Sequence, residues 1–311
     1  MIRCTAALLL MPLAVGCAAD VGRGFGAQAQ RPAFTSNRIS VEVRGSGPDV
    51  LLIPGLSSSA RVWDSTVAAV PGYRYHLIQV AGFAGAPAGA NADGPVVAPV
   101  AEEIARYIGE AGLRKPALVG HSLGGTLAMM IAARHPNLVS RAMVVDMVPF
   151  MGAMFGTPGA TPESVAPVAA QVRAGIAGTG AAQRLSMMQA TMATMIRTEN
   201  LRAEPLAHAL ASDAAVSGQA MYDLIVSDLR PELRQIKVPL KVLWVRAPGA
   251  PMTEVQMENF YKLSYANAPS AVLKRIPDSY HFIMFDEPEA FRRELKSLLQ
   301  SSGGHVGTAK S

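Results

Sequence analysis

A glycine-flanked serine is the first group in this sequence that could do chemistry. Gly120-His-Ser-Leu-Gly124, followed by Gly125, fits the G-x-S-x-G pattern in which a serine stands on a sharp turn between a strand and a helix. The neighbouring segments agree, because Pro116–Val119 is a short apolar run and Thr126–Arg134 has the composition of a helix. Glycines two residues before and after Ser122 would let the strand and the helix approach closely. The pattern therefore indicates Ser122 as a nucleophile.

A serine hydroxyl needs a base to take its proton at neutral pH, and His281 is the histidine best placed for that task. It follows the last predicted strand, and ligand chemistry in an open parallel sheet gathers at the carboxyl ends of the strands. His121 is expected to point away from the serine. The remaining histidines are assigned to a buried strand, a helix end, a helical insertion and the tail, namely His76, His135, His208 and His305. We expect His281 to be the general base and the nearby Asp286 to bind local backbone.

The sequence also predicts the framework that must position these residues. Strands are predicted at Ile39–Arg44, Val50–Ile53, Tyr75–Val80, Pro116–Val119, Arg141–Asp146, Leu240–Val245 and Ala271–Ile276. Helical patterns fall at Val100–Ala111, Thr126–Arg134 and Glu289–Leu299. Strands that alternate with helices predict an α/β fold with a mostly parallel, doubly wound sheet covered on both faces.

The interval 149–234 interrupts this alternation, since it has helical patterns and Gly-Pro turns but no clear strand. We expect a helical cap there, inserted between two parts of the core, 30–148 and 235–300, with a disordered tail at 301–311. Eight of the sixteen methionines lie between Met147 and Met221. A methionine-rich lid can adapt to irregular apolar ligands, although any single methionine is more often a core residue.

The chain resembles the α/β-hydrolase fold superfamily from about Ile39 to Gln300, and within it exported esterases and lipases. Three segments carry the likeness, namely Leu51-Leu-Ile-Pro-Gly-Leu56, Gly120-His-Ser-Leu-Gly124 and the loop with His281-Phe282 that ends in Glu287-Pro288. Pro54 stands where the family usually has histidine, but an oxyanion hole uses main-chain N–H groups and does not need that side chain. The resemblance implies the N–H groups of Leu56 and Leu123 as the oxyanion donors.

The acid that would orient His281 departs from the usual family position. Members most often carry an aspartate in the loop after the strand that follows the cap, but this loop has no carboxylate before Glu254. Some haloalkane dehalogenases instead place the acid at the end of the strand after the nucleophile helix, where this chain has Asp146. That strand would lie about 4.8 Å from the strand before Ser122, at the same edge of the sheet. We expect Asp146 to be the acid, with Glu254 as the alternative; a dyad, with Asp146 only capping a turn, is also open.

The composition sets limits on partners and cofactors. The chain has 311 residues, half of them apolar, and a formal net charge of +5, without a basic run interleaved with aromatics, so no nucleic-acid partner is expected. No apolar stretch approaches the length of a membrane span. The chemistry inferred from Ser122 and His281 needs neither a metal nor an organic cofactor.

The N-terminus has the pattern of a secretory signal peptide. Arg3, the apolar run Ala6–Val15 and Ala27-Gln-Ala29 predict cleavage after Ala29, with a mature protein in the periplasm or outside the cell. Leu13–Cys17 resembles a bacterial lipobox, so lipid attachment at Cys17 is the alternative. Both cysteines lie in this leader, so the mature chain would have no disulfide and no thiol nucleophile.

Together these features predict a serine hydrolase that cleaves a small or medium apolar carboxylic ester through an acyl-enzyme. The same groups would serve a lactonase, an amidase, a carbon–carbon bond hydrolase or a cofactor-free perhydrolase. A non-catalytic member of the fold that binds a hydrophobic ligand is an alternative of a different class. Ser122 argues against a haloalkane dehalogenase or an epoxide hydrolase, which use a carboxylate at this position.

Overall fold

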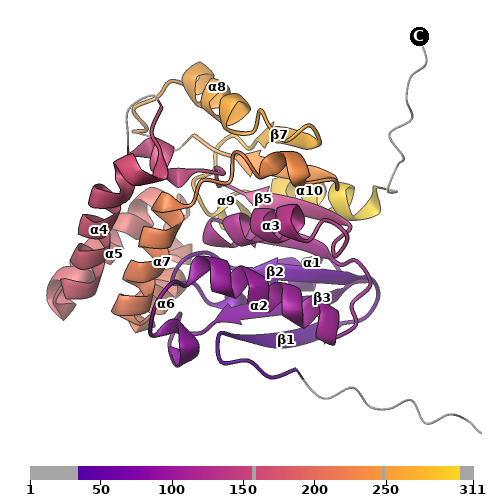
Figure 1. Cartoon of the computed structure of the whole chain (residues 1–311), viewed down its shortest axis with the longest axis horizontal. Coiled ribbons are helices and arrows are strands. Elements are labelled where there is room, and N and C mark those ends of the chain that lie inside the picture. Colours follow the sequence, from indigo (N-terminus) through magenta and orange to yellow (C-terminus); the bar gives the residue numbers. More distant parts are fainter. Residues whose placement is uncertain (1–33, 156–158, 247–248, 302–311) are drawn as a thin grey trace, which may run out of the picture. The chain divides into compact units, whose positions relative to one another are not determined.

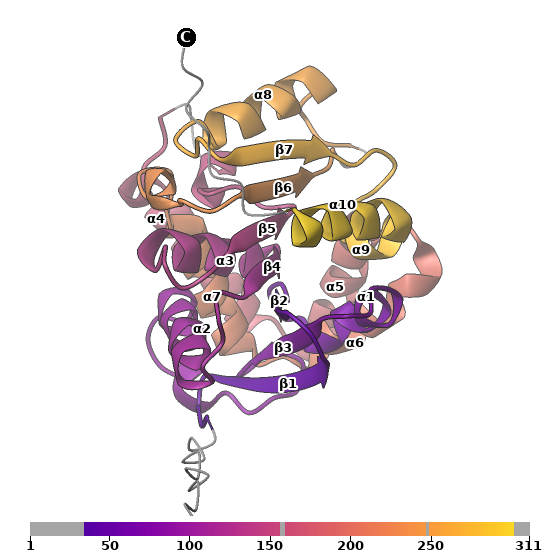
Figure 2. The same cartoon turned by 90° about the vertical axis from the view of Figure 1, so that its right-hand side faces the viewer.

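In the part of the chain that the computed structural model describes, residues 34–155, 159–246 and 249–301, seven strands form one sheet in the order β1-β3-β2-β4-β5-β6-β7 (Figure 2). The strands are β1 (Ile39–Gly45), β2 (Asp49–Ile53), β3 (Arg74–Val80), β4 (Ala117–His121), β5 (Arg141–Val145), β6 (Leu240–Trp244) and β7 (Ala271–Arg275). Only β1 runs antiparallel to its neighbour, β3. These strands confirm the predicted mostly parallel sheet.

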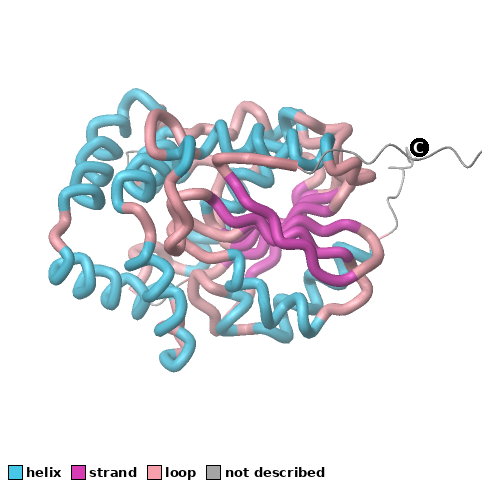
Figure 3. Tube along the Cα trace, turned by 90° about the horizontal axis from the view of Figure 1, so that it is seen from below, coloured by secondary structure: helices cyan, strands magenta, loops and turns pink. Residues whose placement is uncertain are grey.

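Helices cover both faces of the sheet (Figure 3). One face carries α2 (Val97–Glu110), α3 (Leu123–Arg134) and α8 (Glu254–Ser264), which share an apolar core with the sheet. The other face carries α1 (Asp64–Ala69), the short α9 (Ile283–Asp286) and α10 (Pro288–Gln300), together with a second apolar core. Short 3-10 helices complete the order: η1 (Ala60–Trp63), η2 (Gly89–Asn91), η3 (Met151–Met154), η4 (Glu199–Leu201) and η5 (Leu233–Gln235).

The centre of the sheet follows directly from sequence. All five residues of β4 are buried between β2 and β5, as expected for a strand covered on both faces. The next element, α3, is apolar on nearly its whole circumference and is buried from Leu123 to Ala133, because it lies between the sheet and α2. The turn between these two buried elements is therefore fixed from both sides.

Between β5 and β6 the described residues form helices and no strand. They are α4 (Pro162–Gly178), α5 (Ala181–Met195), α6 (Ala203–Ala211) and α7 (Ala214–Val226), which gather beyond one end of the sheet (Figure 1). We call these four helices the insertion; they lie in the interval for which a cap is predicted. Asp223 of α7 accepts hydrogen bonds from the N–H groups of Val96 and Val97 at 2.6 and 3.1 Å. This carboxylate caps α2 and ties the insertion to the core.

Several elements differ from the predictions. Helix α8 was not predicted, because its sequence is mostly polar; it begins at a capping box formed by Thr253 and Gln256. Strand β4 continues two residues beyond Val119, up to the serine. The predicted signal peptide 1–29, with Cys17, and residues 302–311 of the predicted tail lie outside the described residues. Within those, no helix is long and apolar enough to cross a membrane.

Candidate active site

Ser122 occupies the turn between β4 and α3 in a backbone conformation that serine rarely adopts. Its φ is 53° and its ψ is −121°, and its N–H donates to the carbonyl of Val145 at 2.9 Å. A positive φ in a residue with a Cβ costs on the order of 1–3 kcal/mol and persists only where the surroundings enforce it. Here β5 and the buried helix α3 enforce it.

The glycines on either side of Ser122 are required by close contacts. A Cβ at Gly120 would lie 2.0 Å from the carbonyl oxygen of Gly124, and a Cβ at Gly124 would lie 2.2 Å from that of Ile53. Both distances are far below van der Waals contact, and in both cases the obstacle is backbone. Any other residue at these two positions would therefore push α3 away from β2 or β4.

Asp146 and His281 lie in direct contact although 135 positions separate them in sequence. The distance from Asp146 Oδ2 to His281 Nδ1 is 2.7 Å, and both side chains are largely buried. An ionised carboxylate can only accept hydrogen bonds, so Nδ1 of His281 carries the proton and donates it. The Nε2 atom of the neutral ring then has a lone pair that can accept a proton.

The second oxygen of Asp146 is also occupied. Oδ1 accepts hydrogen bonds from the N–H of Val245 at 3.1 Å and from the hydroxyl of Tyr261 at 3.0 Å. Burial, and then the charge of Asp146, raise the pKa of Tyr261 well above its usual value, so the phenol stays a donor. Tyr261 was not among the predicted site residues; it is on α8, and no local motif marks it.

Glu254, the alternative acid, lies elsewhere. It is the first residue of α8, is largely exposed, and pairs with Arg275 at 2.8 Å. Its side chain does not line the cavity that holds Ser122 and His281. The structure thus brings Asp146 to His281 and does not bring Glu254 there.

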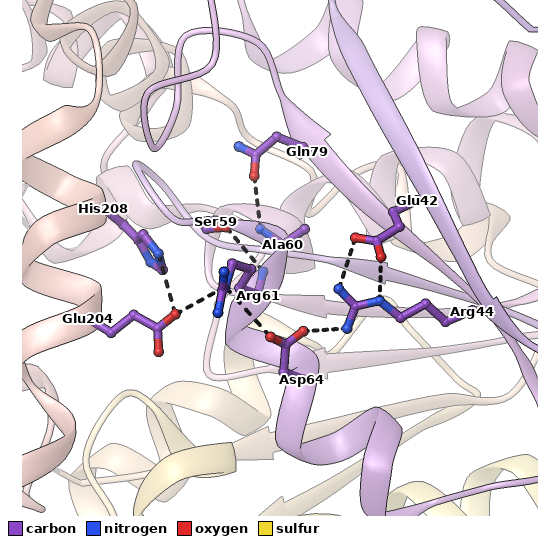
Figure 4. A network of polar contacts seen from close by, with 9 residues as sticks. All are labelled: Glu42, Arg44, Ser59, Ala60, Arg61, Asp64, Gln79, Glu204 and His208. Atoms are coloured by element: carbon purple, nitrogen blue, oxygen red, sulfur yellow. Dashed lines mark hydrogen bonds and ion pairs between the residues drawn. The ribbon is translucent and has the colours of Figure 1, made fainter.

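The segment after β2 is held in place by several polar contacts. Leu56 lines the cavity, and Leu123 is the first residue of α3. Among the described residues, neither main-chain N–H has a hydrogen-bond acceptor. The residues that follow Leu56 are held by two contacts. Gln79 Oε1 accepts the N–H of Ala60 at 3.0 Å, and Arg61 pairs with Glu204 of α6 at 3.5 Å (Figure 4). Two N–H donors near Ser122 are therefore available on an anchored backbone.

His121 lies beneath the loop that carries His281. Its Nε2 is 3.1 Å from the carbonyl oxygen of His281, its ring centre is 4.6 Å from that of His281, and it is almost fully buried. Burial, and then the neighbouring His281, lower the pKa of His121 well below its usual value. His121 is therefore neutral and donates its Nε2 proton to that carbonyl. It supports the loop.

The other histidines lie away from Ser122. His76 is buried in β3 between Asp49 and Tyr107, and burial lowers its pKa. His135 ends α3 and contacts Glu102, and His208 lies on α6, 3.7 Å from Glu204. His305 is outside the described residues.

Asp286 anchors the same loop from the other side. Its carboxylate accepts the N–H of Tyr280 at 3.0 Å, as expected for local backbone, and also those of Arg197 and Thr198, between α5 and α6, at 3.0 and 2.9 Å. The general-base candidate His281 is thus held between β4 and the segment that follows α5.

A cavity of about 500 Å³ opens next to Ser122, and Asp146 and His281 also line it. The remaining wall is mainly apolar and comes from the insertion, η3, α8 and the segments that follow β2, β5, β6 and β7. Its methionines are Met147, Met151, Met154, Met187, Met188, Met192, Met195, Met221 and Met257. Within the described residues, no group of three His, Cys, Asp or Glu side chains is arranged to hold a metal ion.

Two curated relatives that cover most of this chain are esterases. The chain is 27% identical to the pimeloyl-[acyl-carrier protein] methyl ester esterase of Vibrio cholerae, covering 82% of this chain and 95% of the relative. It is 28% identical to the enzyme of the same name from Aeromonas hydrophila, covering 81% and 96%. These relatives confirm the predicted class of enzyme, an ester hydrolase.

Solved structures show the same fold. An esterase from Exiguobacterium antarcticum superimposes with a TM-score of 0.70 at 21% identity, covering 85% of this chain and 96% of that one. The enol-lactonase from Burkholderia xenovorans LB400 superimposes with a TM-score of 0.66 at 18% identity, with the same coverage. Residues 50–294 match the alpha/beta hydrolase family. The predicted fold is thereby confirmed, and the chain belongs to the alpha/beta hydrolase family.

Proposed function

We propose that this enzyme hydrolyses carboxylic esters with an apolar acyl or alcohol part, through an acyl-enzyme formed on Ser122. His281 acts as the general base, Asp146 as the acid that orients it, and the N–H groups of Leu56 and Leu123 as the oxyanion donors. The contact of 2.7 Å between Asp146 and His281, in one cavity with a serine at a strained turn, carries this proposal. These three residues follow three different strands, β4, β5 and β7, and all of them line this one cavity.

The hydrogen bond between Asp146 and His281 leaves Nε2 of His281 free to act as the base. His281 takes the Ser122 hydroxyl proton on Nε2 while the oxygen bonds to the ester carbonyl carbon. The imidazolium then gives this proton to the leaving alcohol as the carbon–oxygen ester bond breaks. Water repeats the sequence on the acyl-enzyme, releasing the acid and restoring Ser122. In both halves Asp146 stabilises the positive charge on His281.

The main-chain donors supply the second part of the catalysis. Negative charge collects on the carbonyl oxygen at each tetrahedral stage, and two preorganised N–H groups stabilise it without moving. The anchoring of the segment after β2 supports this role, because a donor that had to reorient would contribute less. Loss of one such donor typically costs about 100- to 1,000-fold in kcat.

The methionine-rich wall supports an apolar substrate. Thioether side chains are flexible and polarizable, so they can follow an alkyl chain of irregular shape. The Vibrio relative is named for a methyl ester of a pimeloyl group on acyl-carrier protein. We infer a similar aliphatic character for the substrate of this enzyme.

Covalent labelling tests the nucleophile directly. A fluorophosphonate probe should label the parent protein at Ser122 and should not label Ser122→Ala, and turnover of a short p-nitrophenyl ester should fall with it. Ser186→Ala, which changes an exposed serine of α5, is the matched control and should behave as the parent. Unchanged ester turnover in Ser122→Ala would show that the mechanism is wrong.

A further inference from the structure

The cavity next to Ser122 contains a charged group that the proposed reaction does not use. Arg184 of α5 is the only lysine or arginine among the described residues that line it. The only carboxylate there, Asp146, is already bonded to His281. A cation in a mainly apolar wall is unfavourable unless hydrogen bonds or an opposite charge compensate it. The partners of Arg184 therefore indicate what the group is for.

Main-chain carbonyls hold the guanidinium by one nitrogen. Nη2 donates to the carbonyl oxygens of Ala209 at 2.8 Å and of Ser212 at 2.7 Å, at the C-terminal end of α6. The helix dipole favours a positive charge at that end. In the described part of the chain, Nε and Nη1 have no acceptor, and no Asp or Glu pairs with Arg184. The charge is thus fixed in position while part of its donor capacity is unused.

Arg184 also lies close to the oxyanion segment. The carbonyl of Ser212 accepts from Arg184, and the hydroxyl of Ser212 donates to the carbonyl of His208 at 2.8 Å. The same hydroxyl oxygen lies 3.2 Å from the carbonyl oxygen of Ser57, the residue after Leu56. The distances of 2.7 Å from Arg184 to Ser212 and 3.2 Å from Ser212 to Ser57, with the span of one residue, about 4 Å, place the guanidinium within roughly 10 Å of the Ser57 carbonyl. An ester carbonyl bound near Leu56 would therefore lie several methylene groups from Arg184.

We propose that Arg184 binds a carboxylate at the far end of the substrate, so that the enzyme prefers apolar esters bearing a carboxylate several carbons from the ester carbonyl. This inference rests on the proposed ester hydrolysis and narrows it. The methionines contact the aliphatic chain, and the guanidinium supplies a charge-assisted hydrogen bond to its end. The carboxylate can belong to the acyl side, as in monoesters of dicarboxylic acids, or to the alcohol side, as in acetate esters of ω-hydroxy acids.

The test compares substrates that differ only in this charge. The kcat/KM values of the monoethyl and diethyl esters of C6 to C9 dicarboxylic acids are measured for the parent, Arg184→Gln and Arg184→Lys. The ratio of monoester to diester should fall about 10-fold or more in Arg184→Gln, mainly through KM, and Arg184→Lys should keep most of it. The same kcat/KM ratio is measured for acetate esters of ω-hydroxy acids, with the carboxylate free or converted to its methyl ester. Comparison of the two series shows whether the bound carboxylate lies on the acyl side or the alcohol side of the ester.

Arg202→Gln is the matched control. Arg202 directly precedes α6 and, like Arg184, donates to main-chain carbonyls, those of Ile196 and Arg197, but it does not line the cavity. Its substitution should leave the ratio unchanged. A parent enzyme without a preference for the monoester, or an equal fall of the ratio in Arg202→Gln, would overturn the proposal and leave a purely structural role for Arg184.

Two further measurements keep the outcomes separate. If Arg184→Gln does not fold, the ratio of monoester to diester kcat/KM is measured for the parent at rising salt concentration instead. A ratio that does not fall with salt contradicts binding of the monoester by charge. Calorimetric binding of the monoester and diester to Ser122→Ala needs no turnover. If Ser122→Ala binds the monoester more tightly than the diester but the parent hydrolyses neither, the proposed function is wrong and the carboxylate site is supported. If the parent hydrolyses both esters equally well, the proposed function is supported and the carboxylate site is wrong.

Discussion

Replacing Asp146 with asparagine is expected to lower kcat by about 10³- to 10⁴-fold while leaving the fold intact. The structure determines how the new amide would lie. The N–H of Val245 and the hydroxyl of Tyr261 both donate to Oδ1. The amide oxygen must take that position, which turns the NH₂ group toward Nδ1 of His281. His281 then has to accept at Nδ1 and carry its proton on Nε2, so it cannot take the proton of Ser122.

The magnitude has two sources. An imidazolium and a carboxylate about 4 Å apart, at an effective dielectric constant of about 20, attract each other by about 4 kcal/mol. At about 1.4 kcal/mol per factor of ten, loss of this attraction in the transition state alone lowers the rate by about 10³-fold. The inverted tautomer of His281 lowers the rate further, because its Nε2 then carries a proton and cannot accept one from Ser122. The estimate applies here because both side chains are mostly shielded from solvent, with exposed fractions of 11% for Asp146 and 21% for His281.

The assay is single-turnover acylation and steady-state hydrolysis of an aryl ester at pH 7, with the thermal midpoint measured to verify folding. Glu254→Gln is the companion variant, because Glu254 is the other carboxylate that the sequence offers as the acid and it pairs with Arg275 instead. It should remain within about threefold of the parent, which is the scale of a surface ion pair. A folded Asp146→Asn enzyme within tenfold of the parent would refute the assignment, and a large loss in Glu254→Gln would transfer it.

Three other outcomes follow from the same contacts. Tyr261→Phe removes one donor to Asp146 and should lower kcat up to about tenfold, measured with the same ester; an unchanged kcat would contradict a role in holding the carboxylate. Ser122→Gly removes the Cβ from a position with φ of 53° and should raise the free energy of unfolding in urea by about 1 kcal/mol while activity is lost; lower stability would argue against backbone strain there. Stability should fall as the pH drops below about 6.5, because burial lowers the folded-state pKa of His76 and His121, so the unfolded chain binds more protons. Urea unfolding at pH 7, 6 and 5 should show a progressive loss of stability, with about 1.4 kcal/mol per pH unit for each histidine as the upper limit, and a flat profile would contradict this.

Site residues that stand in a local sequence motif could be predicted from the sequence, whereas site residues positioned by helix packing could not. Ser122 stands in a motif whose glycines are dictated by backbone contacts within a few residues. His281 follows a strand and could be chosen by position. Tyr261 and Arg184 lie on α8 and α5, where the side that faces the cavity depends on how each helix packs against elements distant in sequence. No neighbouring residue signals that orientation.

Element boundaries show the same division. The buried strands β2 and β4 were predicted within one or two residues because their apolar runs are continuous. Helix α8 was not predicted, since Met257 and Tyr261 are its only buried residues and most of its other residues are polar. The insertion was predicted as helical from the absence of strands, but its apolar residues do not specify which helices pair. In the structure α4 packs on α7, around Val165, Ala169 and Ile225.

The position of Asp146, the proposed acid, illustrates how one sheet edge can supply the same group from different strands. Asp146 follows β5, yet its Oδ1 accepts the N–H of Val245, the residue that follows the neighbouring strand β6. The carboxylate of Asp146 therefore reaches across to the end of β6, after which the family's aspartate usually stands. A positive φ at Asp146, 53°, turns the chain there, and its own N–H donates to Leu243 of β6 at 2.8 Å. Because adjacent parallel strands end about 4.8 Å apart, a carboxylate on either one can meet the same histidine without moving its loop. A second acid introduced after β6, as Arg246→Asp in Asp146→Asn, should on this reasoning restore part of the lost kcat, and no recovery would mean that the β5 position is required.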